Sequence, residues 1–315
     1  MGADIDRFYE EGCEALLVEQ RELARTLPFR LGLTPRPDIP WSEVFQHRVT
    51  LAAPALFAEA MPHSDERSVR HATISHMFAV IEAFTTDRVH DEQVPDHDGA
   101  LKRLAGGLRF VRDSRIQDLD ADARSAFAIA DRDVRDAHTR EQEILKVRRA
   151  VPLHRYTKIS LQKQAVGFPA TLALARAGGI DHRRRAVIRE ALSGIWLGLQ
   201  YADDVLDWED DYERDGAWAV CIARGLGAEL PADGDFHASR NAVFASGALA
   251  RMLGLSAESF ARTKTLAEQL GAVSLETWAD AQHQRLLELE DGEKQHPGYA
   301  LRAHRLRHFA REVLS

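Results

Sequence analysis

An unusual row of acids closes an apolar stretch in the second half of the chain. Residues 186–212 read as an apolar helical segment that ends in five aspartates and one glutamate. Asp203, Asp207 and Asp211 are four residues apart, and four residues turn about 400° around a helix, so the three carboxylates share one face. Like charges on one face repel each other unless a cation neutralises them. Magnesium is suited to this position, because it prefers oxygen ligands and takes one or two carboxylates together with substrate phosphates. An ordinary solvated helix end is the alternative explanation.

A second acidic pair follows another apolar stretch upstream. Residues 72–91 form a helical segment that closes with Asp87 and Asp91, again four apart on one face. Acids at a helix C-terminus oppose the helix dipole, so two such endings in one chain need a reason. Metal ions held between the two pairs would supply it.

The elements that must position these acids are helices. Apolar residues recur at helical spacing in most of the chain, whereas the alternation typical of strands is scarce. No long low-complexity linker and no repeat interrupts the pattern. We expect an all-α protein in which residues 1–315 form a single domain, a bundle of long helices around a central active-site cavity.

Composition excludes several classes of function. The net charge of −8 argues against nucleic acid as a partner, because binding to a phosphate backbone needs a basic surface. No stretch approaches the ~18 apolar residues of a membrane span, and the acidic N-terminus does not resemble an export signal, so we expect a cytoplasmic protein. Cys13 and Cys221 lie far apart and lack the spacing of metal ligands, so neither a disulfide framework nor a zinc site is expected.

Two motifs then resemble those of a known family. The segment GLQYADDVLDWEDDYERDG is similar to the second aspartate-rich motif of trans-prenyl diphosphate synthases and of the class I terpene synthases that share their all-helical fold. About 40 residues earlier, YTKISLQKQAVGFPATLALARAGG resembles the family's lysine-bearing segment, with Lys158 in the place of the lysine that binds the diphosphate. The resemblance covers roughly residues 40–225. It implies the class I terpenoid synthase fold, several Mg²⁺ ions, and a prenyl diphosphate substrate.

The departures from this family are informative. Asp87 and Asp91 match the outer aspartates of the first motif, but Arg88 stands where the second aspartate is usual. The basic segments that bind a second diphosphate in chain elongators are reduced to Gln46-His47-Arg48 and to residues 94–98. Keeping the metal site while lacking donors for a second diphosphate favours a terpene cyclase, which ionises one substrate.

Further residues are expected to contact the substrate. Gln162 follows Lys158 by four residues and projects from the same face, although an ordinary exposed helix face would explain it equally well. Arg214 lies near the position where the family has a lysine that reaches the diphosphate. Phe84 and Trp196 are candidates for the pocket wall, because aromatic faces stabilise carbocations; ordinary core packing is the alternative. The C-terminal segment carries Arg302, Arg305 and His308 on one side and could close over the diphosphate or complement an acidic surface.

The sequence thus predicts a class I terpene synthase. Asp87 and Asp91 would face Asp203, Asp207 and Asp211 across Mg²⁺ ions, with Lys158 and Arg214 adding positive charge to the departing pyrophosphate. Chain elongation with isopentenyl diphosphate, prenyl transfer to another acceptor, and a catalytically silent regulatory subunit are the alternatives. The chain length of the substrate and the product skeleton stay open, as does a homodimer.

Overall fold

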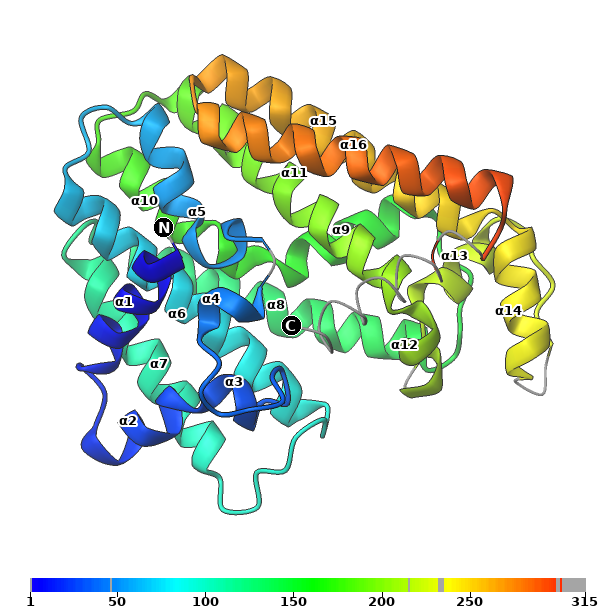
Figure 1. The fold of residues 1–315 in the computed structure, drawn as a ribbon, viewed down its shortest axis with the longest axis horizontal. Helices are drawn as coiled ribbons and strands as arrows, with labels where there is room; N and C mark the ends of the chain where they lie inside the picture. Colours follow the sequence, from blue (N-terminus) through cyan, green and yellow to red (C-terminus); the bar gives the residue numbers. More distant parts are fainter. Residues whose placement is uncertain (1, 46, 215, 232–234, 299–300, 302–315) are drawn as a thin grey trace. The chain divides into compact units, whose positions relative to one another are not determined.

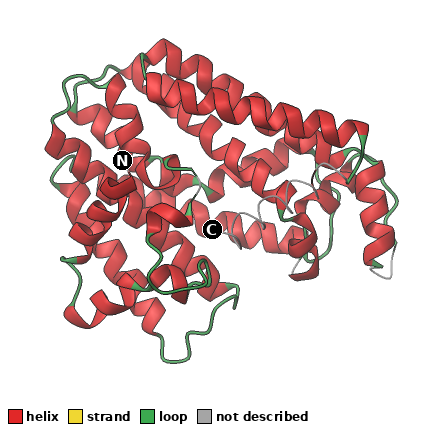
Figure 2. Ribbon diagram, viewed as in Figure 1, coloured by secondary structure: helices red, strands yellow, loops and turns green. Residues whose placement is uncertain are grey.

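The regular structure of the chain is helical (Figures 1 and 2). The computed structural model describes residues 2–45, 47–214, 216–231, 235–298 and 301. Within these ranges it contains sixteen α-helices and two short 3₁₀ helices, and no strand. The predicted all-α fold class is confirmed. No helix in the same ranges is both long and apolar enough to cross a membrane.

The chain divides into two compact units, between which it passes several times. The first unit contains residues 1–132, 165–189 and 270–274, and the second unit contains residues 133–164, 190–269 and 275–315. The helices α8 (Ala123–Leu145) and α11 (His182–Leu206) each begin in the first unit and continue into the second. The single domain expected from the sequence stays a prediction.

The first unit is built around α6. This helix spans Glu66–His90 and begins at Asp65, whose carboxylate accepts a 2.6 Å hydrogen bond from the Ser68 N–H. Every residue from 71 to 82 is buried, which places this segment at the centre of the unit. The helices around it are α1 (Gly2–Cys13), α2 (Val18–Arg25), α3 (Leu27–Arg30), α4 (Trp41–Val44), α5 (Val49–Phe57), η1 (Ala58–Ala60), α7 (Ala100–Gln117), η2 (Ala165–Gly167) and α10 (Pro169–Ala177).

The second unit carries the longer acidic row. Its helices besides α8 and α11 are α9 (Leu153–Lys163), α12 (Trp208–Arg214), α13 (Trp218–Gly225), α14 (Phe236–Ala245), α15 (Ala248–Leu270) and α16 (Val273–Gln295). In Figure 1, α11, α15 and α16 run side by side. The Phe260 ring of α15 meets the Trp278 ring of α16 edge-on, with 5.3 Å between ring centroids.

Two glycines let α11 and α15 approach closely. A Cβ atom on Gly198 would lie only 2.7 Å from the Phe260 ring, and one on Gly194 would collide with Thr263 and the Ser259 carbonyl. The Ser256 hydroxyl on α15 donates a 2.6 Å hydrogen bond to the Gly198 carbonyl oxygen. The position of α11, and so of the acids at its end, is therefore fixed by direct packing against α15.

Candidate active site

The acidic row lies where α11 passes into α12. The sequence predicts one helix through residue 212, whereas α11 ends at Leu206, α12 begins at Trp208, and Asp207 lies between them. The helical hydrogen bonds nevertheless continue across this break: the Asp207 N–H donates to the Asp203 carbonyl at 3.0 Å, and the Asp211 N–H donates to the Asp207 carbonyl at 2.9 Å. The three aspartates therefore keep their four-residue step, as predicted from their spacing.

The row is electrostatically strained. Asp203 and Asp207 are exposed and Asp211 is half-buried. Although Asp203 reaches solvent, protein atoms around its carboxylate reduce its hydration and raise its pKa to about 7, and repulsion from Asp207 and Asp211 adds to the rise. Burial raises the pKa of Asp211 to about 6, against the attraction of Arg214 and together with repulsion from Asp207. A cation bound to the row would relieve this strain.

A buried polar layer fixes the helix turn that carries the row. Asp204 is buried and accepts a 2.5 Å hydrogen bond from the Tyr156 hydroxyl of α9 and a 2.9 Å bond from the Gln200 amide. The Gln200 side-chain oxygen in turn accepts from the Gln164 amide at 2.6 Å. Burial raises the pKa of Asp204 to about 8. Because buried polar groups need their partners, this chain of bonds sets the rotation of α11 about its axis.

Lys163 provides positive charge near the row, a role that the sequence analysis did not give it. Its ammonium group lies 2.8 Å and 2.7 Å from the two carboxylate oxygens of Glu141 on α8, and the Trp218 indole N–H donates to Glu141 at 2.7 Å. The Lys163 charge lowers the pKa of Asp203, against the effect of burial. The sequence alone places Lys163 seven residues after Tyr156, and so on the same face of α9. The structure shows that this face is the buried one at Tyr156.

Arg214 contacts the last member of the row directly. Its guanidinium group donates to the Asp211 carboxylate at 3.0 Å and to the Asp210 carbonyl oxygen at 3.2 Å. The side chain is about half exposed. Arg214 is therefore close to the acids, as its predicted contact with the substrate requires.

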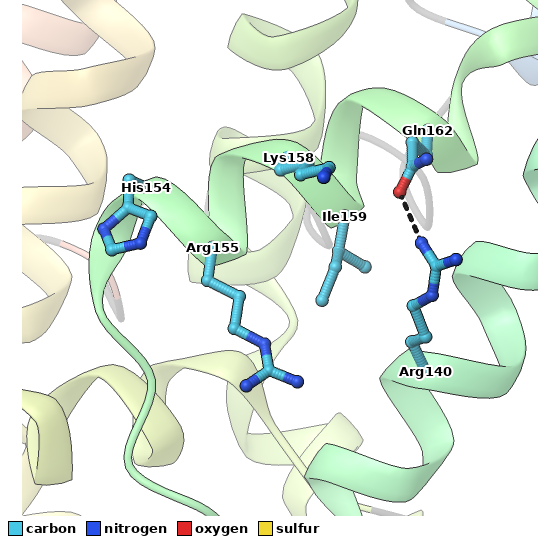
Figure 3. Close-up of a pocket in the computed structure, with 6 residues that line it drawn as sticks. All are labelled: Arg140, His154, Arg155, Lys158, Ile159 and Gln162. Carbon is cyan, nitrogen blue, oxygen red and sulfur yellow. Dashed lines mark hydrogen bonds between the residues drawn. The ribbon is translucent and has the colours of Figure 1, made fainter.

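Lys158 and Gln162 lie on another face of α9. They line a pocket of about 440 Å³ together with Arg140, His154, Arg155 and Ile159 (Figure 3). The Arg140 guanidinium, which comes from α8, donates a 3.0 Å hydrogen bond to the Gln162 side-chain oxygen. None of the acidic-row residues lines this pocket. The predicted contact of Lys158 and Gln162 with the diphosphate stays a prediction.

The first acidic pair lies in the first unit, at the end of α6. Asp87 is in the last turn, and Asp91 caps the helix with its N–H donating to the Asp87 carbonyl at 2.9 Å. Arg88 donates a 2.7 Å hydrogen bond to the Leu31 carbonyl oxygen, which follows α3. This contact joins residues 57 apart in the chain, and the sequence analysis did not predict it.

Comparison with known proteins identifies the fold. No family model matches the chain, and no curated protein matches it by sequence. A polyprenyl synthetase from Streptomyces coelicolor is similar over 89% of this chain and 97% of its own, with a TM-score of 0.70 and 14% identity. A geranylgeranyl pyrophosphate synthetase from Geoglobus acetivorans matches over 90% and 97%, with a TM-score of 0.70 and 16% identity.

A polyprenyl synthase from Caulobacter crescentus, solved with calcium and isoprenyl diphosphate, matches over 89% of this chain and 93% of its own, with a TM-score of 0.65 and 18% identity. The chain has the fold of the prenyl diphosphate synthases. The fold implied by the two sequence motifs is thereby confirmed. At these identities the likeness establishes the fold, and the chemistry has to be argued from the site.

The carboxylates of the acidic row are suitable ligands for magnesium. Asp203, Asp207 and Asp211 offer carboxylate oxygens, the ligands that Mg²⁺ prefers. In the described ranges no three His, Cys, Asp or Glu side chains converge closely enough to hold a metal ion by themselves. Mg²⁺ usually takes one or two protein carboxylates and completes its coordination with water and phosphate oxygens.

The remaining predicted residues are placed as follows. Phe84 of α6 packs edge-on against Phe45, with 5.2 Å between ring centroids. Trp196 is buried in α11, seven residues and so about two helical turns before Asp203. Their role as a pocket wall stays a prediction. Arg302, Arg305 and His308, and with them the proposed C-terminal cover, lie outside the described residues.

Proposed function

We propose that this protein is a magnesium-dependent enzyme that ionises an allylic prenyl diphosphate and transfers the prenyl group. The observation that carries the proposal is the acidic row of Asp203, Asp207 and Asp211, held in register across the break between α11 and α12. The chain that carries this row has the same fold as a polyprenyl synthetase and a geranylgeranyl pyrophosphate synthetase. Burial, with repulsion between the carboxylates, raises the pKa values of Asp203 and Asp211, and bound cations would favour their charged forms.

In this proposal each protein group has a limited task. Asp203, Asp207 and Asp211 would hold Mg²⁺, and the metal would supply the Lewis acidity that stabilises a departing pyrophosphate. Arg214, which contacts Asp211 in this structure, would donate a charge-assisted hydrogen bond to a diphosphate oxygen. Asp204 is a positioning residue, because its bonds to Tyr156 and Gln200 hold the turn in place. No aspartate needs to transfer a proton.

We propose that Asp87 and Asp91 also bind Mg²⁺. Both offer carboxylate oxygens at the C-terminus of α6, where a metal ion would offset the unfavourable interaction of negative charge with the helix dipole.

We place chain elongation ahead of cyclisation, which reverses the order suggested by the sequence. Solved proteins that share this fold include a polyprenyl synthetase, a geranylgeranyl pyrophosphate synthetase and a heptaprenyl diphosphate synthase. Cyclisation is retained as the second candidate because Arg88 replaces the usual aspartate and the expected basic segments are reduced. The two reactions differ in one requirement, since elongation needs isopentenyl diphosphate and cyclisation does not.

The test is release of pyrophosphate from geranyl, farnesyl and geranylgeranyl diphosphates, each with and without isopentenyl diphosphate, in Mg²⁺ and in EDTA. Elongation predicts turnover only with both substrates and Mg²⁺, whereas cyclisation predicts turnover from one substrate. Asp207→Asn should abolish either activity, while Glu213→Gln, which removes an equal charge from an exposed position of α12, should keep it. No turnover under any condition would leave the silent-subunit alternative.

A further inference from the structure

A strongly basic pocket lies between α8 and α9 within the second unit. Arg140, Arg155 and Lys158 carry permanent positive charges into its wall, and the His154 imidazole joins them (Figure 3). Among the residues that the structure describes, Ile159 and Gln162 complete the lining, so no carboxylate in these ranges lines the pocket. A pocket of about 440 Å³ falls within the range of roughly 300–1,000 Å³ that is usual for small-molecule sites.

The arrangement of these side chains opposes the stability of α9. Arg155 and Lys158 are three residues apart, so like charges meet on one helix surface. Arg155 lies in the first turn, where the helix dipole disfavours positive charge. Among the residues that the structure describes, no carboxylate pairs with Arg155 or Lys158. A bound anion would offset the repulsion between these positive side chains.

The N-terminal end of α9 also favours negative charge. The N-cap residue is Pro152, which provides no side-chain hydrogen bond to the first turn, and this turn contains no acidic residue. The first N–H groups of a helix have no partner within the helix and carry partial positive charge, which favours an anion. The side chains and the helix end therefore favour the same kind of ligand.

α9 thus serves two polar sites on two faces. Tyr156 and Lys163 face the buried layer beneath the acidic row, where they bind Asp204 and Glu141. His154, Lys158 and Gln162 follow each other at four-residue steps and form the basic face. The basic pocket and the acidic row are separate groups of residues, and only the acidic row needs a metal to bind an anion.

We propose that the pocket of Arg140, His154, Arg155 and Lys158 is an anion site that binds a diphosphate group through positive charge alone, without a metal ion. The diphosphate has two possible sources: the pyrophosphate released by the reaction and the diphosphate end of a second isoprenoid substrate. The second source rests on the proposed function; the binding itself does not. It would give the chain donors for a second diphosphate that the reduced basic segments do not provide.

The experiment is calorimetric titration of the full chain in EDTA, with inorganic pyrophosphate in one arm and isopentenyl diphosphate in the other. The test variant is the double substitution Arg155→Gln/Lys158→Gln. Its matched control is Arg135→Gln/Lys146→Gln, which removes the same charge from positions of the second unit outside the pocket. All four side chains reach solvent, so circular dichroism should show unchanged helix content.

The wild-type chain and the control pair should bind in EDTA, and the test pair should bind at least about tenfold more weakly, as expected for lost charge-assisted hydrogen bonds. Tighter binding of isopentenyl diphosphate would assign the pocket to a second substrate, and equal or tighter binding of pyrophosphate would assign it to the released product. Absence of binding in EDTA, or an equal loss in both pairs, would overturn the proposal. Because the readout is binding without metal, it stays informative whether or not the enzyme turns over.

Discussion

The contact between Gly198 and Phe260 predicts a stability change whose sign can be worked from the structure. In Gly198→Ala the new Cβ would lie 2.7, 2.8 and 3.0 Å from three carbons of the Phe260 ring. Ordinary carbon contacts begin near ~3.5 Å, so the ring has to retreat by roughly 0.8 Å. Phe260 is 1% exposed and rests against Trp278, which leaves it little room. Overpacking of this kind costs about 1–3 kcal/mol, against about 1 kcal/mol gained when alanine replaces glycine in a helix. We expect a net loss of stability.

The control is the same substitution at Gly106, in the middle of α7. Gly106 is exposed, and no atom lies within 4 Å of the place that a Cβ would take there, so Gly106→Ala should stabilise the protein by about 0.5–1 kcal/mol. Urea unfolding followed by circular dichroism measures both variants. In a double-mutant cycle, Phe260→Leu should remove most of the cost of Gly198→Ala, because it shortens the obstructing side chain. Equal effects of the two alanines would refute the close approach of α11 and α15.

Three further predictions concern the acids, Arg88 and a buried histidine. Asp203→Asn should abolish Mg²⁺-dependent turnover with unchanged helix content, and near wild-type turnover would remove the row from the metal site. Arg88→Asp should lower activity or change the product, and should also cost about 1–3 kcal/mol in urea unfolding because the Leu31 carbonyl loses its charged donor; a clear gain in activity would instead indicate a decayed site. Burial lowers the pKa of His76 to about 4, from about 6.5 in an unfolded chain, so the folded state favours the neutral ring, whose Nε2–H donates to the Thr50 carbonyl. Its contribution to stability is present above pH 6.5 and should fall by about 3 kcal/mol toward pH 4, and His76→Gln should flatten that decline.

Local patterns were sufficient to predict the helices and the acidic row. The four-residue spacing of Asp203, Asp207 and Asp211 survived the break at Asp207, because the helical hydrogen bonds continue across it. The aspartates at 87 and 91 likewise ended a helix as their apolar segment predicted. Such features depend on residues close in sequence, so they can be predicted from the spacing of apolar and acidic residues along the chain.

Partners distant in sequence could not be predicted in this way. Lys163 meets Glu141 from 22 residues away, and Arg88 meets Leu31 from 57 residues away. Several residues near a site could satisfy the same charge, and only tertiary packing selects among them. The basic pocket was missed for this reason, because Arg140 joins Arg155 and Lys158 only when α8 lies beside α9.

The passage of single helices through both compact units limits how this protein can be dissected. The boundaries after residues 132 and 189 fall inside α8 and α11, whereas those after residues 269 and 274 fall at the end of α15 and the start of α16. A gene fragment that encodes either unit would therefore cut α8 and α11 in their interior and would expose their apolar faces. Limited proteolysis should accordingly yield nicked chains that stay associated rather than a stable metal-binding fragment. Fragment-based screening or labelling of one half alone is best replaced by segmental labelling of the intact chain.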